Sequence, residues 1–215
     1  MTEAVVLCGG AGRRIGGRSK PYVPLAGRPL LEHVLGRLRA ARPAGRPFSR
    51  ILLAGDASAE GAFTVHDPPE YVGRGPLAGV LAGLEAAAAE WVFVCACDAP
   101  FPSPGLVAAL HELVGGDVEA VVPKWRADAQ ARSKERVFVE PLFAWWRRDA
   151  AAAIRAALRR NERGVSALLR KMKVKWASES LLRTHDPRLL SFFNVNSPRE
   201  MEEAESLWRG SATVR

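Results

Sequence analysis

The segment that most constrains the fold is Trp91–Cys97, which reads WVFVCAC. Successive side chains of a strand point to opposite faces of its sheet, and here both faces are apolar. This pattern is typical of a central parallel strand covered by helices on both sides. Four more apolar runs alternate with helical patterns, as in βαβ units: Ala4–Cys8, Arg50–Ala54, Phe63–His66 and Val118–Pro123. We therefore predict an α/β fold with a mostly parallel, doubly wound sheet.

Prolines and capping residues mark the expected helix starts. Proline is tolerated in the first turn of a helix, where its missing N–H would be unpaired anyway. The prolines in such positions are Pro29, Pro76, Pro104 and Pro198. Ser103 and Ser197 are candidate N-caps, and Glu200 completes capping-box spacing with Ser197. Asp149 is a further candidate cap, for a helix through AAAAIRAALRR.

Length and composition favour one globular domain over residues 1–215. No apolar run approaches the roughly 20 residues that span a bilayer, and Glu3 stands too early for a secretory signal. We therefore expect a cytoplasmic protein that does not enter a membrane. The formal net charge of +8 suits a polyanionic ligand. Nucleic-acid binding is not favoured, because zinc-finger spacing and a basic helix with interleaved aromatics are both missing from the sequence. The three cysteines do not indicate a disulfide framework or a metal site.

A glycine- and arginine-rich loop follows the first strand and reads LCGGAGRRIGGRSK from Leu7 to Lys20. Glycines let backbone N–H groups approach a phosphate closely, and the basic side chains add donors. A Walker loop needs Gly-Lys followed by Ser or Thr, which does not occur here. The dinucleotide fingerprint needs a glycine where Ile15 stands. The loop therefore predicts a phosphate site of another kind.

Two aspartates stand directly after predicted strands, where open parallel sheets bind their ligands. Asp98 follows the most apolar strand and suits Mg²⁺, although an aspartate also commonly begins a turn. The neighbouring phosphate loop makes us favour the metal. Asp67 precedes two prolines, and its spacing alone favours a turn residue.

Three further segments are open to more than one interpretation. Gly75–Gly83 places glycines on one helix face, which suits close packing, while Gly75 at the helix start suits an anion. Asn194 and Asn196 alternate along a predicted strand, so their amides need backbone or ligand partners. Lys124–Arg136 is polar and predicts a surface loop that orders on a ligand.

Five segments together carry a family resemblance: LCGGAGRRIGGRSK, GRGPLAG, CACDAP, EPLFAWWRRD and FFNVNSP. In this order, from Leu7 to about Leu207, they resemble the molybdenum cofactor guanylyltransferase family. The resemblance implies a Rossmann-like nucleotidyltransferase fold and transfer of GMP from GTP to the phosphate of molybdopterin or Mo-molybdopterin. Pyrophosphate is the other product. It also implies molybdoenzymes or other proteins of the cofactor pathway as partners.

The resemblance implies a role for each matching position. The GTP-binding loop spans residues 7–20, and its matching residues are Leu7, Cys8, Gly9, Gly10 and Lys20. Asp67 matches the aspartate that recognises guanine, against the turn interpretation, and Asp98 matches the magnesium ligand. Lys20, Arg13 and Asp98 are the implied catalytic residues. Asn194 and Asn196 match asparagines near the active site, within an acceptor-side segment of residues 124–196.

Some positions depart from the family pattern. Alanine is usual at Cys8, methionine at Ile15, aspartate at Ser19, histidine at Glu140 and asparagine at Ala54. Ser19 and Glu140 leave the acceptor open. Alternatives are a guanylyl- or cytidylyltransferase for another phosphorylated cofactor, such as adenosylcobinamide phosphate, and a catalytically weak protein that delivers the cofactor to partners.

Overall fold

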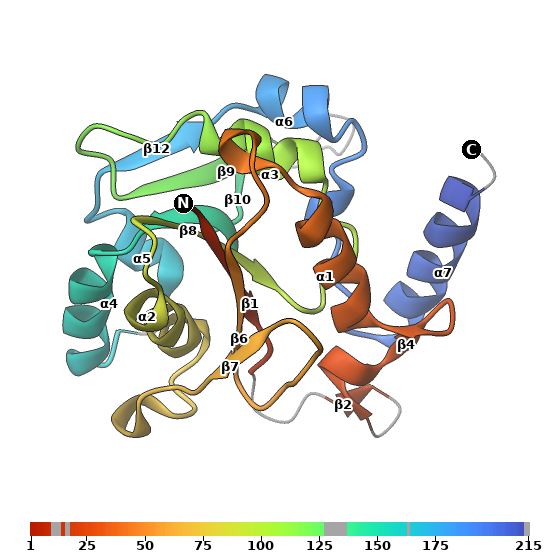
Figure 1. The fold of residues 1–215 in the computed structure, drawn as a ribbon, viewed down its shortest axis with the longest axis horizontal. Helices are drawn as coiled ribbons and strands as arrows, with labels where there is room; N and C mark the ends of the chain where they lie inside the picture. Colours follow the sequence, from red (N-terminus) through yellow and green to blue (C-terminus); the bar gives the residue numbers. More distant parts are fainter. Residues whose placement is uncertain (10–13, 16–17, 127–136, 163, 213–215) are drawn as a thin grey trace.

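An eight-stranded sheet organises the chain in the computed structural model, which describes residues 1–9, 14–15, 18–126, 137–162 and 164–212 (Figure 1). Its parallel part runs in the order β7–β6–β1–β8, and β11 then pairs antiparallel with β8. β9 pairs with β11, and β10 and β12 pair with β9. The strands are β1 (Glu3–Leu7), β6 (Arg50–Ala54), β7 (Phe63–Val65), β8 (Trp91–Ala96), β9 (Ala120–Arg126), β10 (Val137–Val139), β11 (Phe143–Arg147) and β12 (Val174–Ala177). The mostly parallel sheet is confirmed.

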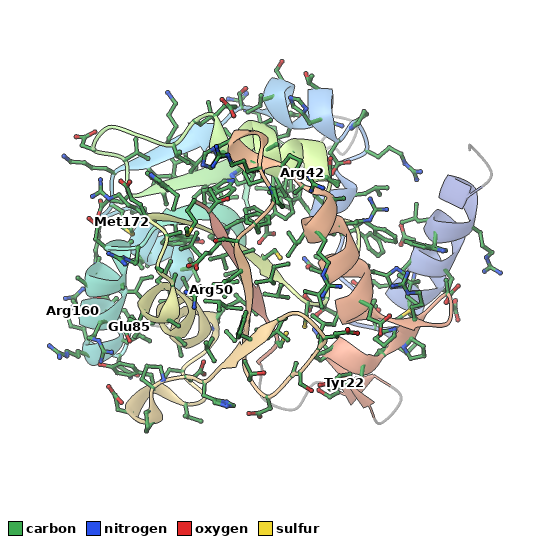
Figure 2. All side chains as sticks on the ribbon, in the orientation of Figure 1. Tyr22, Arg42, Arg50, Glu85, Arg160 and Met172 are labelled. Carbon is green, nitrogen blue, oxygen red and sulfur yellow. The ribbon has the colours of Figure 1, made fainter. Side chains whose placement is uncertain are left out.

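Helices cover both faces of this sheet because its central strands are apolar on both. Val5 and Leu7 point into one core, packed by α2 (Pro76–Ala86), α4 (Ala150–Arg159) and α5 (Val165–Leu169). Ala4 and Val6 point into the other core, packed by α1 (Leu30–Ala40), α3 (Pro104–His111) and α6 (Glu179–His185). Figure 1 shows the first group on one side of β1 and α1 on the other, and in Figure 2 Glu85 and Arg160 project on the side of α2 and α4. The doubly wound arrangement is confirmed.

A third, smaller core joins the end of the chain to its beginning. Helix α7 (Pro198–Ala212) packs through Ala204 against Leu25 of the β4–β5 hairpin (Pro24–Leu25 and Arg28–Pro29). Another short hairpin, β2–β3, pairs Arg14–Ile15 with Arg18–Ser19. In the described part of the chain, no helix has the length and apolar character that a membrane crossing requires.

The expected helix starts are confirmed with one exception. Pro76, Pro104 and Pro198 open their helices, and Pro29 is the N-cap of α1. Ser103 Oγ accepts a hydrogen bond from Leu106 N–H at 3.2 Å, and Ser197 Oγ accepts one from Glu200 N–H at 3.3 Å. The helix predicted after Asp149 is confirmed as α4, but the capping bond expected from Asp149 was wrong. Asp149 holds the N-cap position of α4, but its carboxylate accepts from Arg147 Nε at 2.7 Å and caps nothing. The neighbouring guanidinium is a stronger donor than a backbone amide.

Two strand boundaries also differ from the prediction. Asn194 and Asn196 do not lie on a strand, because the segment between Phe192 and α7 pairs with no strand of the sheet. Lys124–Arg136 was predicted as a loop, but Lys124, Trp125 and Arg126 extend β9 and pair with β10. Trp125 stacks on its cross-strand partner Phe138, with ring centroids 5.5 Å apart, and this contact favours pairing over a polar loop. Residues 127–136 lie outside the described residues.

Candidate active site

The candidate site lies at the carboxyl ends of β1, β6 and β8. Leu7 is in register with Ala54 on one side and Ala96 on the other. Beyond the strands, the loops after β1 and β6 stay in contact, because Cys8 N–H donates to Ala54 O at 2.8 Å. Gly55 has a φ of +126°, and a Cβ there would lie 2.7 Å from Gly9 N. Only glycine therefore lets these loops approach so closely where the loop of residues 7–20 begins.

Three segments far apart in the sequence meet at Lys20. Its Nζ lies 2.6 Å from Asp98 Oδ2 and 2.5 Å from Asn196 Oδ1. The side chains of Lys20 and Asp98 are 16% and 17% exposed, so water screens this ion pair only in part. The segment holding Asn196 is fixed to the strand end, since Val195 N–H donates to Asp98 O at 2.8 Å. The sequence singled out Lys20, Asp98 and Asn196 separately, and the structure brings them together.

A pocket opens beside this cluster. Asp98, Asn194 and Asn196 line it together with Glu140, and Asn194 Nδ2 donates to Phe192 O at 3.4 Å. The remaining lining residues are mostly apolar: Ala96, Ala99, Leu142, Phe143, Ser191 and Phe192. Of these, sequence reasoning singled out none. The doubled phenylalanine before Asn194 and the EPLF segment were the available signals, but neither shows by itself which ring faces a pocket.

Glu140 enters the pocket from a break between β10 and β11. Its backbone N–H donates to Pro123 O and its backbone O accepts from Phe143 N–H, both at 3.2 Å. Burial raises the pKa of the Glu140 carboxyl, the negative charge of Asp98 adds to the rise, and the hydrogen bond from Leu142 N–H opposes it. Sequence reasoning named Glu140 only as a departure from the family pattern, and the structure makes it part of the site.

Asp67 follows β7 at the same edge of the sheet. Burial raises the pKa of its carboxyl, the nearby charge of Asp56 raises it further, and His66 lowers it. Helix α2 leaves space beside it: a Cβ on Gly79 would lie 3.7 Å from Asp67 Oδ1 and 3.2 Å from Leu7 Cδ2. Asp67 therefore borders the end of β1, where the loop of residues 7–20 begins.

The packing explanation holds for the glycines of α2. A Cβ on Gly83 would lie 2.5 Å from Val5 Cγ2, so the helix rests directly on β1 at this point. Gly75 has a φ of +86° and forms the N-cap of the helix. Two of the predicted loop residues, Gly10 and Arg13, lie outside the described residues.

Oxygen donors dominate the part of the site that can hold a metal. Asp98 Oδ2 is occupied by Lys20, while no donor in the described part of the chain reaches Asp98 Oδ1. Asn194 and Asn196 line the same pocket, and the amide oxygen of Asn196 accepts from Lys20. Among the described residues, no three His, Cys, Asp or Glu side chains gather as a metal centre. One carboxylate oxygen beside the predicted phosphate loop fits Mg²⁺, which takes few protein ligands and fills its shell with phosphate and water.

The cysteines lie under the site. Cys8 and Cys97 stand at the ends of adjacent strands, and their side chains form a hydrogen bond that raises the pKa of the Cys97 thiol, as burial also does. Burial likewise raises the pKa of Cys95. All three cysteines are free thiols. The raised pKa values favour the uncharged form of Cys95 and Cys97.

Comparisons with known proteins agree over almost the whole chain. A family model described as a MobA-like NTP transferase domain matches residues 4–176. The chain is 32% identical over 213 residues to a probable molybdenum cofactor guanylyltransferase of Methanosarcina mazei, covering 93% of this chain and 88% of the relative. It is 29% identical to a molybdenum cofactor guanylyltransferase of Desulfosudis oleivorans, covering 94% and 93% of the two chains. The crystal structure of molybdopterin-guanine dinucleotide biosynthesis protein A from Archaeoglobus fulgidus superposes with a TM-score of 0.74 at 27% identity, covering 98% of this chain and 100% of the other.

Proposed function

Because the chain belongs to the MobA-like NTP transferase family, we infer that it transfers GMP from GTP to the phosphate of molybdopterin and releases pyrophosphate. The observation that carries this inference is the cluster of Lys20, Asp98 and Asn196, at the sheet edge where open α/β folds bind their ligands. Lys20 ends the loop of residues 7–20, and Asp98 and Asn196 line the pocket together with Glu140. GTP would occupy the loop side and the acceptor the pocket side.

We assign guanine recognition to Asp67. The base offers two adjacent donors, N1–H and the 2-amino group, and one carboxylate can accept both. Adenine and the pyrimidines do not present this pair. No donor in the described part of the chain reaches the Asp67 carboxylate, and burial raises its pKa. Binding of guanine would supply those donors.

Lys20 is the residue that we assign to the phosphates. An ammonium group has three N–H donors, and Asp98 and Asn196 accept two of them. The third is left for a phosphate oxygen, and the positive charge offsets the charge that grows on the departing pyrophosphate. Leu7, Cys8 and Gly9 would hold the nucleotide through the backbone at the start of the loop, with Gly10 and Arg13 contributing from the residues outside the described part.

The reaction needs little covalent chemistry from the protein. An oxygen of the acceptor phosphate attacks the α-phosphorus of GTP in line, and the bond to the β-phosphate oxygen breaks. The attacking phosphate is already ionised at neutral pH, so no general base has to remove a proton. Asp98, with the amide oxygens of Asn194 and Asn196 nearby, would hold Mg²⁺, which supplies positive charge next to the transferred phosphate. The protein itself aligns the two substrates.

The test is transfer of labelled nucleotide. Purified protein, Mg²⁺ and molybdopterin are incubated with each of the four NTPs labelled at the α-phosphate. We expect label to reach the cofactor from GTP alone, and Asp98→Asn to slow transfer by about 10²-fold or more. Asp149→Asn is the matched control, because among the described residues the carboxylate of this exposed aspartate pairs only with Arg147, outside the site.

The other outcomes separate the alternatives. Transfer from CTP would make the chain a cytidylyltransferase. Transfer to adenosylcobinamide phosphate, but not to molybdopterin, would change the acceptor. Binding of GTP and cofactor without any transfer would favour a delivery protein over an enzyme.

A further inference from the structure

The pocket beside Asp98 has two chemically different parts. One part is formed by Asp98 and Asn196, which hold the Lys20 ammonium beside the pocket. Another part carries the carboxylate of Glu140. A phosphate is attracted to the ammonium and repelled by Glu140. A molecule with a phosphate at one end should therefore bind with its phosphate near Lys20. An uncharged group with several hydrogen-bond donors should then lie near Glu140.

A bulge presents Glu140 to this pocket. Val139 pairs with Lys124 of β9, and Trp145 pairs with Val121 of β9. These two pairs are three residues apart along β9 but six residues apart along the opposite segment. The three additional residues are Glu140–Leu142. Bulges of this kind redirect side chains and are frequent next to active sites.

The Glu140 carboxylate has unused capacity to accept hydrogen bonds. In the described part of the chain its single donor is Leu142 N–H, which reaches Oε1 at 3.4 Å. A carboxylate has two oxygens and accepts about four hydrogen bonds. A partly buried carboxylate with too few donors costs free energy, and a ligand with N–H groups lowers that cost.

Aromatic rings beside Glu140 provide a surface for a flat ring. Phe192 lines the pocket and stacks on Trp125, with centroids 4.4 Å apart and planes 14° apart. It also meets Phe143 edge to face at 5.4 Å. These contacts fix Phe192 before any ligand arrives, and such surfaces bind planar heterocycles well.

We propose that Glu140 recognises the pterin ring of the acceptor, accepting hydrogen bonds from its N3–H and 2-amino groups while the ring packs on Phe192. This proposal rests on the proposed function, since it takes the acceptor to be molybdopterin. The pterin edge has the same adjacent donor pair as guanine. The enzyme would thus read both substrates with carboxylates, guanine with Asp67 and pterin with Glu140. Glu140 is then a specificity-determining residue, and the phosphate end of the acceptor lies near Lys20.

The first test separates acceptor binding from nucleotide binding. Loss of a hydrogen bond to a charged group costs about 1.5–3 kcal/mol, so Glu140→Gln should raise the KM for molybdopterin about tenfold or more. The KM for GTP should not change. Glu112→Gln, at an exposed glutamate outside the pocket, is the matched control. Thermal melting of each variant shows whether it is folded. An unchanged KM for molybdopterin, or an equal rise for both substrates, overturns the proposal.

The second test does not depend on transfer. Lumazine carries an oxygen where pterin carries the 2-amino group, so it presents an acceptor to the carboxylate. Binding of 6-hydroxymethylpterin and 6-hydroxymethyllumazine is measured through their own fluorescence. We expect wild type to prefer the pterin about tenfold, and Glu140→Gln to lose this preference. If wild type binds both equally or neither, the assignment of Glu140 is wrong. If the preference is present but molybdopterin receives no GMP, the proposed function fails instead.

Discussion

The two ends of the central strands carry carboxylates in different surroundings. At the amino ends, Glu3 is buried, with 1% of its surface exposed. Its carboxylate accepts hydrogen bonds from Arg50 Nε at 2.6 Å and from the backbone N–H groups of Ala88 and Ala89 at 2.7 and 3.1 Å. At the carboxyl ends, Asp67 and Glu140 are partly buried, and the described residues give them few hydrogen-bond donors. Burial favours a raised pKa for Glu3, but its hydrogen bonds, with Arg50 first, hold the pKa below the ordinary value. For Asp67 and Glu140, burial prevails and the pKa rises.

The difference separates structural carboxylates from binding ones. The chain supplies every donor that Glu3 needs, so this group stabilises the folded state. It supplies few to Asp67 and Glu140, so these groups cost stability until a ligand arrives. Binding sites commonly hold such unsatisfied groups. Substitutions at the two ends of the sheet should therefore have opposite effects on stability and on activity.

The largest expected effect is at Lys20. Lys20→Met removes the ammonium but keeps most of the aliphatic chain, and should lower the rate of GMP transfer by about 10²–10³-fold. Melting should change little, because Asp98 is partly exposed and loses a partner that a ligand or water can replace. Single-turnover transfer of labelled GMP is the measurement. A variant that transfers at the wild-type rate would remove Lys20 from the reaction.

Glu3→Gln should have the largest effect on stability. It leaves Arg50 and two backbone N–H groups facing a neutral amide, and we expect a loss of about 2–3 kcal/mol in the free energy of unfolding. Urea denaturation measures it. The KM for GTP should stay at the wild-type value, since Glu3 lies at the other end of β1 from the site. An active-site defect in a folded Glu3→Gln protein would contradict the comparison.

Asp67→Asn tests base recognition. The amide keeps one acceptor and places an N–H donor against guanine, so the preference for GTP over ATP should fall about tenfold or more. Competition between the labelled nucleotides gives this ratio directly. Asp117→Asn is the matched control, because it makes the same change at an exposed aspartate that pairs with Lys173. An unchanged ratio in Asp67→Asn would leave guanine recognition to other residues.

Sequence reasoning predicted the parts of this site that depend on strand ends. Asp98 and Asp67 follow apolar strands, and parallel strands end at one edge, so their shared location was predictable. The contact between Lys20 and Asn196 was not, because it depends on a segment without secondary structure that returns 176 residues later. The place of Glu140 depends on the bulge between β10 and β11, and periodicity alone does not locate a bulge. The strand expected at Asn194 and Asn196 was wrong for a related reason. The two asparagines alternate in the sequence, but no strand of the described residues pairs with this segment.

The pH dependence of stability should differ between the two ends. A group whose pKa is raised in the folded state favours folding at low pH, and this contribution is lost as pH rises through the folded pKa. Asp67→Asn and Glu140→Gln should therefore raise the melting temperature at pH 7 by about 2 °C each, and not at pH 4. Glu3 has a lowered pKa, so its contribution is present above the ordinary value of 4.5 and is lost as pH falls. Melting curves at both pH values check the signs, and identical pH behaviour of all three variants would contradict the assignment.

The smallest expected change in GTP binding comes from a comparison of two glycines on one face of α2. Gly83→Ala places a Cβ 2.5 Å from Val5 Cγ2 in the core, and should cost about 1–3 kcal/mol of stability without changing the KM for GTP. Gly79→Ala places its Cβ 3.2 Å from Leu7 Cδ2 and 3.7 Å from Asp67 Oδ1, at the site end of the same helix. Leu7 has to move by only a few tenths of an ångström, so the loss of stability should be smaller than for Gly83→Ala. Crowding beside Asp67 should raise the KM for GTP about threefold, or roughly 0.6 kcal/mol. Melting and GTP titration of both variants measure the contrast. The opposite result, a change in GTP binding for Gly83→Ala and none for Gly79→Ala, would contradict the comparison. It would mean that the part of β1 that affects GTP binding extends as far as Val5.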